Sequence, residues 1–489
     1  MTVPSVSPAV SLFVSKLSIS KSAISKSAIS TSSIPRSFGL NFSANQSRFS
    51  KTLLASALAL SFMGAGLSSA QAATSAMPDA AKFAAGVEQK VIDWRRDLHQ
   101  HPELSNREFR TSKIVEKHLK SLGLEVQTGV AHTGVVAILK GGKLKGGKSG
   151  PLIAIRADMD ALPVTEVVDL PFASKATDTY RDQKVGVMHA CGHDTHVAML
   201  MGVAENLVKV KDNLAGDVMF IFQPAEEGAP EGEEGGAKLM LKEGLFAKRK
   251  PDQVFGMHVT SSMPSGMIGL RSGPAMASED SFTIKVKGRQ THGSRPWNGV
   301  DPIVAAAQII TNVQTIVSRQ VDITKAPAVV SFGAVNGGIR SNIIPDEVEL
   351  IGTIRTFDQP MRADIKVRLA EIAELSAKTL GATATTEIHP GYPVVVNNPE
   401  LVASMRPVLA SVVGDKMLIE PGLITGAEDF SYYALETPGM FFFLGVTPKG
   451  TDPEAAASNH SPAFYVDESA LKVGVEAMTK VALTALNGQ

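Results

Sequence analysis

The sequence predicts an α/β protein in which a mostly parallel sheet carries helices on both faces and a smaller α+β unit is inserted. Apolar runs of strand length alternate with longer segments whose apolar residues recur at helical spacing. Acidic residues and histidines follow several of these runs, as expected where parallel strands end. From about residue 278 the order of elements becomes β-α-β-β-α-β, which is the order of a ferredoxin-like split unit.

Length and composition indicate a soluble protein of more than one domain. A chain of 489 residues suits two or three domains. A hydrophobic content of 44% with 20% charged residues is ordinary for a globular protein. The formal net charge is zero, which argues against nucleic-acid binding.

Residues 1–72 have the composition of a targeting segment. They carry six basic residues and no acidic one, and their long Ser-rich first part is expected to be disordered. Arg48 and Lys51 precede the apolar run 52–67, which ends in the small-residue site 70–72. This order predicts a secretory signal peptide and export across the inner membrane to a bacterial periplasm, with no stable membrane anchor. A transmembrane anchor and an organelle transit peptide are the alternatives.

Residues 78–277 are expected to form the first part of the larger unit. Apolar residues at helical spacing lead from Ile114 to Leu122, and Gly123 closes that helix. Short, fully apolar runs in the same region predict buried strands. We expect helices at 91–99, 110–122 and 197–210, strands at 134–139, 151–156 and 218–222, and a solvated turn at 140–150.

Residues 278–389 are expected to form the smaller unit, and residues 390–489 return to the first pattern with a helix from Val402 and a strand at 441–444. Because the first pattern resumes, the smaller unit is interpreted as an insertion into the larger one. The smaller unit is expected to have strands at 281–287, 328–335, 347–355 and 383–389, with helices at 303–319 and 361–380.

The only cysteine, Cys191, lies in the segment Met-His-Ala-Cys-Gly-His-Asp-Thr-His at residues 188–196. A single cysteine makes no internal disulfide, and an exported thiol needs protection that a metal would supply. Thiolate and imidazole select transition metals such as zinc or manganese over calcium. Cys191 and His193 are two residues apart and can converge on one ion. The alternative is an inert buried cysteine beside surface histidines.

Other candidate ligands follow other strand-like runs, and parallel strand ends converge on one edge of a sheet. Adjacent carboxylates at such an edge allow one to bind metal while its neighbour moves a proton. The acidic residues at 231–234 are instead interpreted as a solvated loop. The strand-end candidates are Asp158, Asp160, Glu226, Glu227, His258 and His460.

Several separate motifs resemble the aminoacylase and carboxypeptidase-G type of metallopeptidase. More narrowly, they are similar to its hippurate hydrolase and auxin-conjugate amidohydrolase branch. The resemblance extends over about residues 85–485. The motifs are Arg95–Ser105, Met188–His196, Gln223–Gly228, Gly256–His258, Gly426–Phe430 and Asn459–Ser461.

This resemblance implies two divalent metal ions per subunit, with Glu226 as general base and acid. Cys191 would stand in the bridging role that a carboxylate has in other branches. The branch implies Mn²⁺, whereas the thiolate implies Zn²⁺. Asp160 would orient the site from outside the ligand set, and His189 and His196 are expected beside the site or at a helix start. The implied ligands are Cys191, His193, Glu227, His258 and His460.

The resemblance also implies that the inserted unit is a lid and dimerisation domain. His292 would then stabilise the oxyanion, often from the partner subunit of a homodimer. Asn342 and Arg355 would bind the substrate carboxylate, and Gly426 would line the pocket. For Arg355 the alternative is a surface residue of a strand.

The resulting hypothesis is an exported metallo-amidohydrolase that cleaves N-acyl amino acids, such as hippurate or N-acetyl amino acids. Metal-activated water would attack the amide carbonyl, with Glu226 as the base. A dipeptidase with the same centre is one alternative, and a non-catalytic periplasmic binding protein is another. Glu226 distinguishes the enzyme from the binding protein, because a binding protein needs no spare carboxylate beside a metal ligand.

Overall fold

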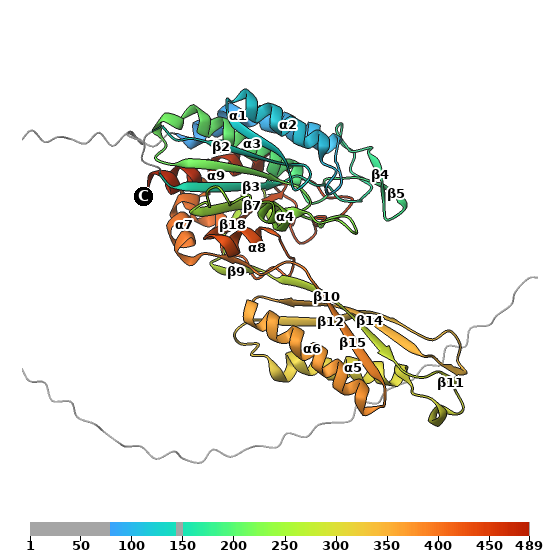
Figure 1. The fold of residues 1–489 in the computed structure, drawn as a ribbon. Coiled ribbons are helices and arrows are strands. Elements are labelled where there is room, and N and C mark those ends of the chain that lie inside the picture. Colours follow the sequence, from blue (N-terminus) through green and yellow to red (C-terminus); the bar gives the residue numbers. More distant parts are fainter. Residues whose placement is uncertain (1–78, 143–149, 489) are drawn as a thin grey trace, which may run out of the picture. The chain divides into compact units, whose positions relative to one another are not determined.

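The computed structural model describes residues 79–142 and 150–488, which form two main sheets and the helices packed on them (Figure 1). The predicted signal peptide and most of the predicted solvated turn lie outside the described residues. The described residues form one compact unit, and the domain boundaries expected at 278 and 389 stay predictions. Within the described ranges, no helix has the length and apolar character needed to span a bilayer.

The larger sheet has eight strands in the order β1-β2-β6-β3-β7-β18-β8-β17. Its centre, from β6 to β18, is parallel, while β2 and β8 pair antiparallel at its two sides. The sheet is therefore mostly parallel, as predicted. Its strands are β1 Glu125–Val130, β2 Gly134–Leu139, β3 Leu152–Asp158, β6 Asp217–Gln223, β7 Gln253–Pro264, β8 Ile268–Gly269, β17 Leu418–Ile419 and β18 Gly439–Thr447.

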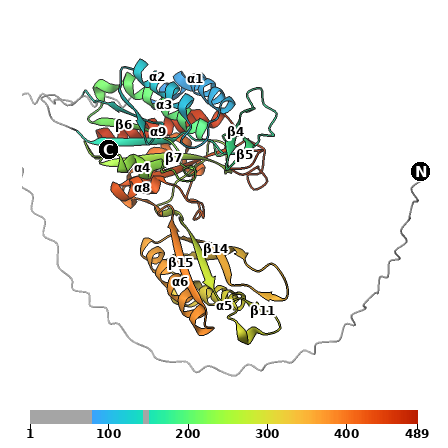
Figure 2. The same cartoon turned by 45° about the vertical axis from the view of Figure 1, so that its right-hand side comes forward.

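Helices cover both faces of this sheet (Figures 1 and 2). The helices α1, α2, α3, α7 and α9 pack on one face, and the short helices α4 and α8 pack on the other. Their bounds are α1 Ala80–Gln100, α2 Phe109–Ser121, α3 His193–Lys209, α4 Gly236–Lys242, α7 Pro399–Val413, α8 Phe430–Glu436 and α9 Ser469–Asn487.

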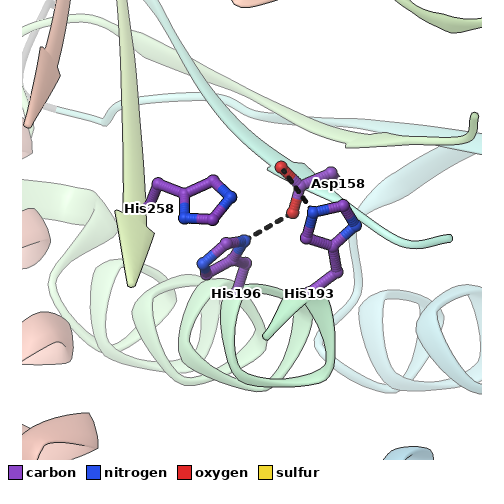
Figure 3. Close-up of side chains that lie close together, drawn as sticks. All are labelled: Asp158, His193, His196 and His258. Atoms are coloured by element: carbon purple, nitrogen blue, oxygen red, sulfur yellow. Dashed lines mark hydrogen bonds and ion pairs between the residues drawn. The ribbon is translucent and has the colours of Figure 1, made fainter. Parts of the chain in front are cut away.

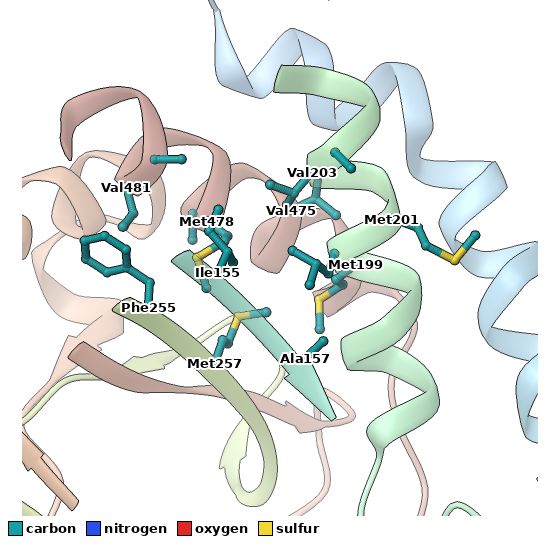
Figure 4. Packing of buried hydrophobic residues seen from close by; sticks show 14 of the residues in the cluster. Ile155, Ala157, Met199, Met201, Val203, Phe255, Met257, Val475, Met478 and Val481 are labelled. Carbon is teal, nitrogen blue, oxygen red and sulfur yellow. The ribbon is translucent and has the colours of Figure 1, made fainter. Parts of the chain in front are cut away.

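The central strands are apolar on both sides because each face of the sheet has its own core. Side chains alternate along a strand, so Phe220 of β6 faces one core while Met219 faces the other. Figure 4 shows the first of these cores, where Met199 of α3 and Met257 of β7 lie close to Ile155 of β3. This packing fixes the ends of the central strands at one edge of the sheet.

The second sheet has four antiparallel strands in the order β12-β14-β10-β15, with α5 and α6 packed on it. This order is the ferredoxin-like arrangement that the sequence predicted. Its elements are β10 Ser278–Lys287, α5 Pro302–Thr315, β12 Ala328–Asn336, β14 Glu347–Thr356, α6 Gln359–Thr379 and β15 Thr383–Pro390. Short pairs complete the fold: β4 Thr177–Tyr180 with β5 Gln183–Gly186, β9 Gly273–Met276 with β16 Val395–Asn397, and β11 Thr291–His292 with β13 Ile343–Ile344.

Three local features differ from the sequence-based expectations. The edge strand β1 was not predicted, because most of its side chains are exposed and it lacks an apolar run. His258 lies inside β7 and not after it. The helix expected to end at Arg319 leaves α-helical geometry after Thr315 and continues as a π-helical turn, Ile316–Gln320.

Candidate metal centre

A tight turn at Gly192 places Cys191 and His193 on the same cluster. Gly192 has a φ of 95°, which favours glycine, and α3 begins at the next residue. A Cβ atom on Gly192 would lie 2.4 Å from the side chain of Val259. The close approach therefore brings the cysteine segment against β7, which carries His258.

Each of the five predicted ligands lies within a few ångströms of another. Cys191 Sγ lies 3.1 Å from His460 Nε2 and 3.4 Å from His258 Nε2. Glu227 Oε1 lies 3.0 Å from His460 Nε2 and 3.9 Å from His193 Nε2. The structure thus brings together Cys191, His193, Glu227, His258 and His460, as the sequence predicted, although their roles as ligands stay predictions.

Two of these imidazoles are oriented by backbone carbonyls. His193 Nδ1 donates to the carbonyl of Asp160 at 2.8 Å, and His258 Nδ1 donates to that of Val259 at 2.6 Å. Each Nε2 atom is then left with its lone pair facing the cluster. A second partner that fixes the tautomer in this way is the usual arrangement around metal-binding histidines.

The cluster fits a bound cation. His193 Nε2 is buried and, among the described residues, has no hydrogen-bond partner. Burial and the nearby carboxylate of Glu227 raise the pKa of the Cys191 thiol well above its ordinary value, so a thiolate there requires a positive charge beside it. Nitrogen, sulfur and carboxylate donors in one buried group suit a divalent transition metal. His460, whose side chain is 53% exposed, leaves this site open to solvent.

His196 has a different role from His193, although both lie on α3 (Figure 3). His196 Nδ1 lies 2.5 Å from Asp158 Oδ1, and its Nε2 accepts from the amide of Val259 at 2.9 Å. Both ring nitrogens are therefore engaged, and His196 supports the cluster without a free ligand atom. His189 is buried with neither ring nitrogen paired among the described residues, and burial lowers its pKa to about 4.

A buried ion network lies behind the cluster. Arg156 of β3 donates to Asp158 at 2.6 Å, to Glu428 at 2.7 Å and to Asp429 at 2.8 Å. Gln223 accepts from the same guanidinium and donates to Asp429. An arginine buried among several carboxylates stays charged and holds them in fixed positions.

Sequence reasoning missed most of this network. Arg156 is the one cation in an otherwise apolar strand run, which was a usable signal. Glu428 and Asp429 stand in one of the family-like motifs but received no role. Their proximity to Arg156 follows from the sheet order, which the sequence pattern does not give.

Glu226 lies beside the cluster and pairs with no arginine or lysine among the described residues. Its Oε2 atom is 3.8 Å from His193 Nε2, and no hydrogen bond engages its carboxylate among the described residues. Burial, with Glu428 nearby, raises the pKa of Glu226 well above its usual value. Asp160 accepts hydrogen bonds from the amides of Glu226 and Glu227 at 3.0 and 3.1 Å, which agrees with an orienting role.

The predicted substrate-binding residues are not part of this cluster. His292 is exposed, and its Nδ1 accepts from the amide of Ser294. Asn342 lies next to it, because the Gly293 amide donates to the Asn342 carbonyl at 2.8 Å. Arg355 lies 3.3 Å from Glu279 in the four-stranded sheet. The carbonyl of Gly426 accepts from Ala277. Their contacts with a substrate stay predictions.

The chain belongs to peptidase family M20/M25/M40, whose model matches residues 154–484. Thermostable carboxypeptidase 2 of Saccharolobus solfataricus is 42% identical over 402 residues, which cover 82% of this chain and 96% of the relative. The N-acetyl-L-cysteine deacetylase of Bacillus subtilis is 38% identical over 385 residues, with coverages of 79% and 85%. IAA-amino acid hydrolase ILR1-like 2 of Arabidopsis thaliana is 35% identical over 405 residues, with coverages of 81% and 86%.

A solved structure agrees with these relatives. A dinuclear metal-binding peptidase of the M20 family from Bacillus subtilis superposes with a TM-score of 0.68 at 36% identity, covering 83% of this chain and all of that chain. The predicted family resemblance is therefore confirmed. The protein is a metal-dependent hydrolase of amide bonds, and the alternative of a non-catalytic binding protein is excluded.

Proposed function

We propose that this enzyme hydrolyses N-acyl amino acids, such as hippurate or N-acetyl amino acids, with Glu226 as the general base. The observation that carries the proposal is the placement of Glu226. Its carboxylate lies beside the predicted ligands, 3.8 Å from His193 Nε2, is buried, and pairs with no arginine or lysine among the described residues. The deacetylase and the IAA-amino acid hydrolase among the relatives support this substrate class.

The predicted site residues have separate roles in the proposed reaction. Cys191, His193, Glu227, His258 and His460 would hold two divalent ions, which when bound polarise the amide carbonyl and make water more acidic. Glu226 takes a proton from the attacking water and delivers it to the leaving amine nitrogen. His292 donates to the oxygen that becomes negative, and Arg355 or Asn342 binds the carboxylate of the amino-acid part.

The carboxyl environment of Glu226 suits proton transfer in both directions. Burial and neighbouring carboxylates favour its protonated form, whereas cations at the ligand cluster favour the ionised form. These opposite influences move the pKa of a general base toward the working pH. The geometry thus supports one group that accepts a proton early in the reaction and returns it later.

The test is Glu226→Gln, which keeps the size of the side chain and removes the base. We expect unchanged metal content and a loss of kcat of about 10³-fold or more, measured with a panel of hippurate and N-acetyl amino acids in Mn²⁺. Glu231→Gln in the exposed acidic loop nearby is the matched control and should behave as wild type. Wild-type turnover in Glu226→Gln contradicts the mechanism.

A second candidate substrate is a peptide, because the carboxypeptidase of Saccharolobus solfataricus is 42% identical to this chain. A dipeptide is an amino acid acylated by another amino acid, so the same centre could cleave both. Dipeptides in the same panel, compared by kcat/KM, separate the two candidates.

Three further features belong to the proposal. The enzyme uses Mn²⁺ or Zn²⁺, which elemental analysis of the purified protein decides. It forms a homodimer through the inserted unit, which light scattering checks. It is exported after cleavage behind Ala72, and sequencing of the mature N-terminus tests that.

A further inference from the structure

Side chains from distant parts of the chain hold the loop that carries Glu226. Glu108 accepts from the amide of Ala225 at 2.9 Å, and Asp160 accepts from the next two amides. Ala225 has a φ of 51°, which residues other than glycine adopt uncommonly. The surroundings therefore impose the shape of this loop, since its own sequence does not favour it.

Tyr392 makes a further hydrogen bond to this loop. Its hydroxyl donates to the carbonyl oxygen of Glu226 at 2.6 Å. Tyr392 lies between β15 and β16, where the chain leaves the four-stranded sheet. Its own carbonyl accepts from the amide of Glu279 on β10, the strand by which the chain enters that sheet, at 2.9 Å. Tyr392 thus contacts the backbone of Glu226 and both segments by which the chain enters and leaves the four-stranded sheet.

The segment by which the chain leaves the four-stranded sheet is held by contacts with β10, α6 and α8. Arg362 of α6 donates to the carbonyl of Gly391 at 3.0 Å and pairs with Asp280 of β10 at 2.6 Å. The hydroxyl of Tyr432 donates to the same Gly391 carbonyl at 3.2 Å, and its ring packs edge-on against Tyr392. Tyr392 is therefore the member of this group that reaches Glu226.

The hydroxyl of Tyr392 is held as a donor. Burial and the nearby carboxylates of Asp429 and Glu226 raise the pKa of Tyr392 well above its usual value. The phenol therefore stays protonated, and it donates to a carbonyl that can only accept.

We infer that Tyr392 is a positioning residue, whose hydroxyl fixes the backbone of Glu226 and ties the general base to the crossover between the two sheets. The inference rests on the proposed role of Glu226. A base must stay within hydrogen-bond reach of the proton it takes, and a displacement of about 1 Å can cost about 10²-fold in rate. This hydrogen bond would transmit a movement of the inserted unit to the backbone of Glu226.

The experiment compares Tyr392→Phe with Tyr432→Phe in the full-length, Mn²⁺-loaded enzyme. Each change removes one hydroxyl from the same pair of edge-to-face rings, but within this pair only Tyr392 donates to Glu226. We expect Tyr392→Phe to lower kcat about tenfold with KM and metal content nearly unchanged, and Tyr432→Phe to keep kcat within about twofold. Amide exchange in the peptide around residues 223–229 should accelerate only in Tyr392→Phe.

A double variant separates this inference from the proposed function. In the Glu226→Gln background, Tyr392→Phe should cause no further loss, because residues that act through one group are not additive. Equal losses in both tyrosine variants, or a full tenfold additional loss without the base, overturn the inference. If Glu226→Gln keeps its activity, the proposed function is overturned. If Glu226→Gln is inactive but Tyr392→Phe has wild-type kcat, only the inference about Tyr392 is overturned.

Discussion

Three histidines of one short segment differ in what their ring nitrogens contact. His196 has both nitrogens bonded, His189 has neither bonded among the described residues, and His193 has Nδ1 bonded and Nε2 free toward the cluster. Only the last arrangement presents an oriented lone pair to a metal. The residue type alone therefore does not distinguish these roles, whereas the second hydrogen bond does.

Cys191 contacts two of the other predicted ligands, so its removal tests the centre directly. Ser in its place keeps the size but is a poor transition-metal ligand, since it lacks the soft thiolate. We expect Cys191→Ser to lower metal affinity at least about tenfold, measured by titration calorimetry on metal-free protein. Kinetics should show a matching loss of activity at limiting metal.

The reactivity of the Cys191 thiol in the wild-type protein is the control for this variant. In metal-free wild-type protein Cys191 should react slowly with a thiol reagent, because it is only 7% exposed, and bound metal should block the reaction. Full metal occupancy and full activity in Cys191→Ser would show that the thiol has no role in the centre.

At the level of elements, the loop after β6 and the start of α2 are joined by Glu108. Its Oε1 accepts from Asn106 and Ala225, and its Oε2 from the hydroxyl of Thr133 at 2.5 Å. No cation pairs with Glu108 among the described residues. Burial, with Asp160 nearby, raises its pKa from 4.5 to about 8, so this joint is most stable when the carboxyl is protonated.

Glu108 predicts a pH dependence of stability. A carboxyl with a raised pKa in the folded state stabilises fully below its unfolded value of 4.5, and this contribution is lost as the pH rises through about 8. Gln keeps the oxygen that accepts from the two amides and places an NH2 group, which can donate to the Thr133 hydroxyl oxygen, where Oε2 stood, but it does not ionise. The Tm of Glu108→Gln relative to wild type should therefore rise by about 3 °C between about pH 5 and pH 9.

Thermal unfolding at saturating Mn²⁺ across that range measures the effect. Glu116→Gln on the same helix, whose partner is Lys120, is the control and should keep a constant difference from wild type. A constant difference for Glu108→Gln as well would mean that Glu108 is ionised throughout.

For the whole molecule, the inserted unit has features of an interface. Its edge strand β12 leaves Val329 and Val335 exposed. Trp297 is exposed in the short 3-10 helix Pro296–Asn298, and Ile339 is exposed in a loop. His292 lies in the same unit, and its side chain contacts Ser294 of its own loop. These features support the proposal that a second copy covers this unit and that His292 acts in the partner's site.

A hybrid dimer tests this proposal. Glu226→Gln and His292→Ala subunits should each form inactive homodimers, and a two-tag hybrid of them should regain about half of wild-type activity, because one of its two sites is intact. The measurement is kcat per purified dimer. A hybrid as inactive as its parents would place His292 in the site of its own subunit, and a monomer by light scattering would remove the proposal.

The sequence by itself determined the sheet with helices on both faces, the ferredoxin-like insertion and the candidate ligands. Strand and helix periods are local properties, and residues such as Cys191 and His193 are close in the chain, so their proximity needed no tertiary information. Glu226 and Glu227 were identifiable because they follow a buried strand. Most of these predictions rest on neighbours within a few residues.

Only the tertiary structure decided which groups hold the centre in place. Arg156 meets Glu428 from 272 positions away, and Tyr392 meets Glu226 from 166 positions away. His258 also proved to lie within its strand and not at the end. Contacts of this kind depend on the order and register of strands, which arise when the whole core packs, so no local pattern encodes them.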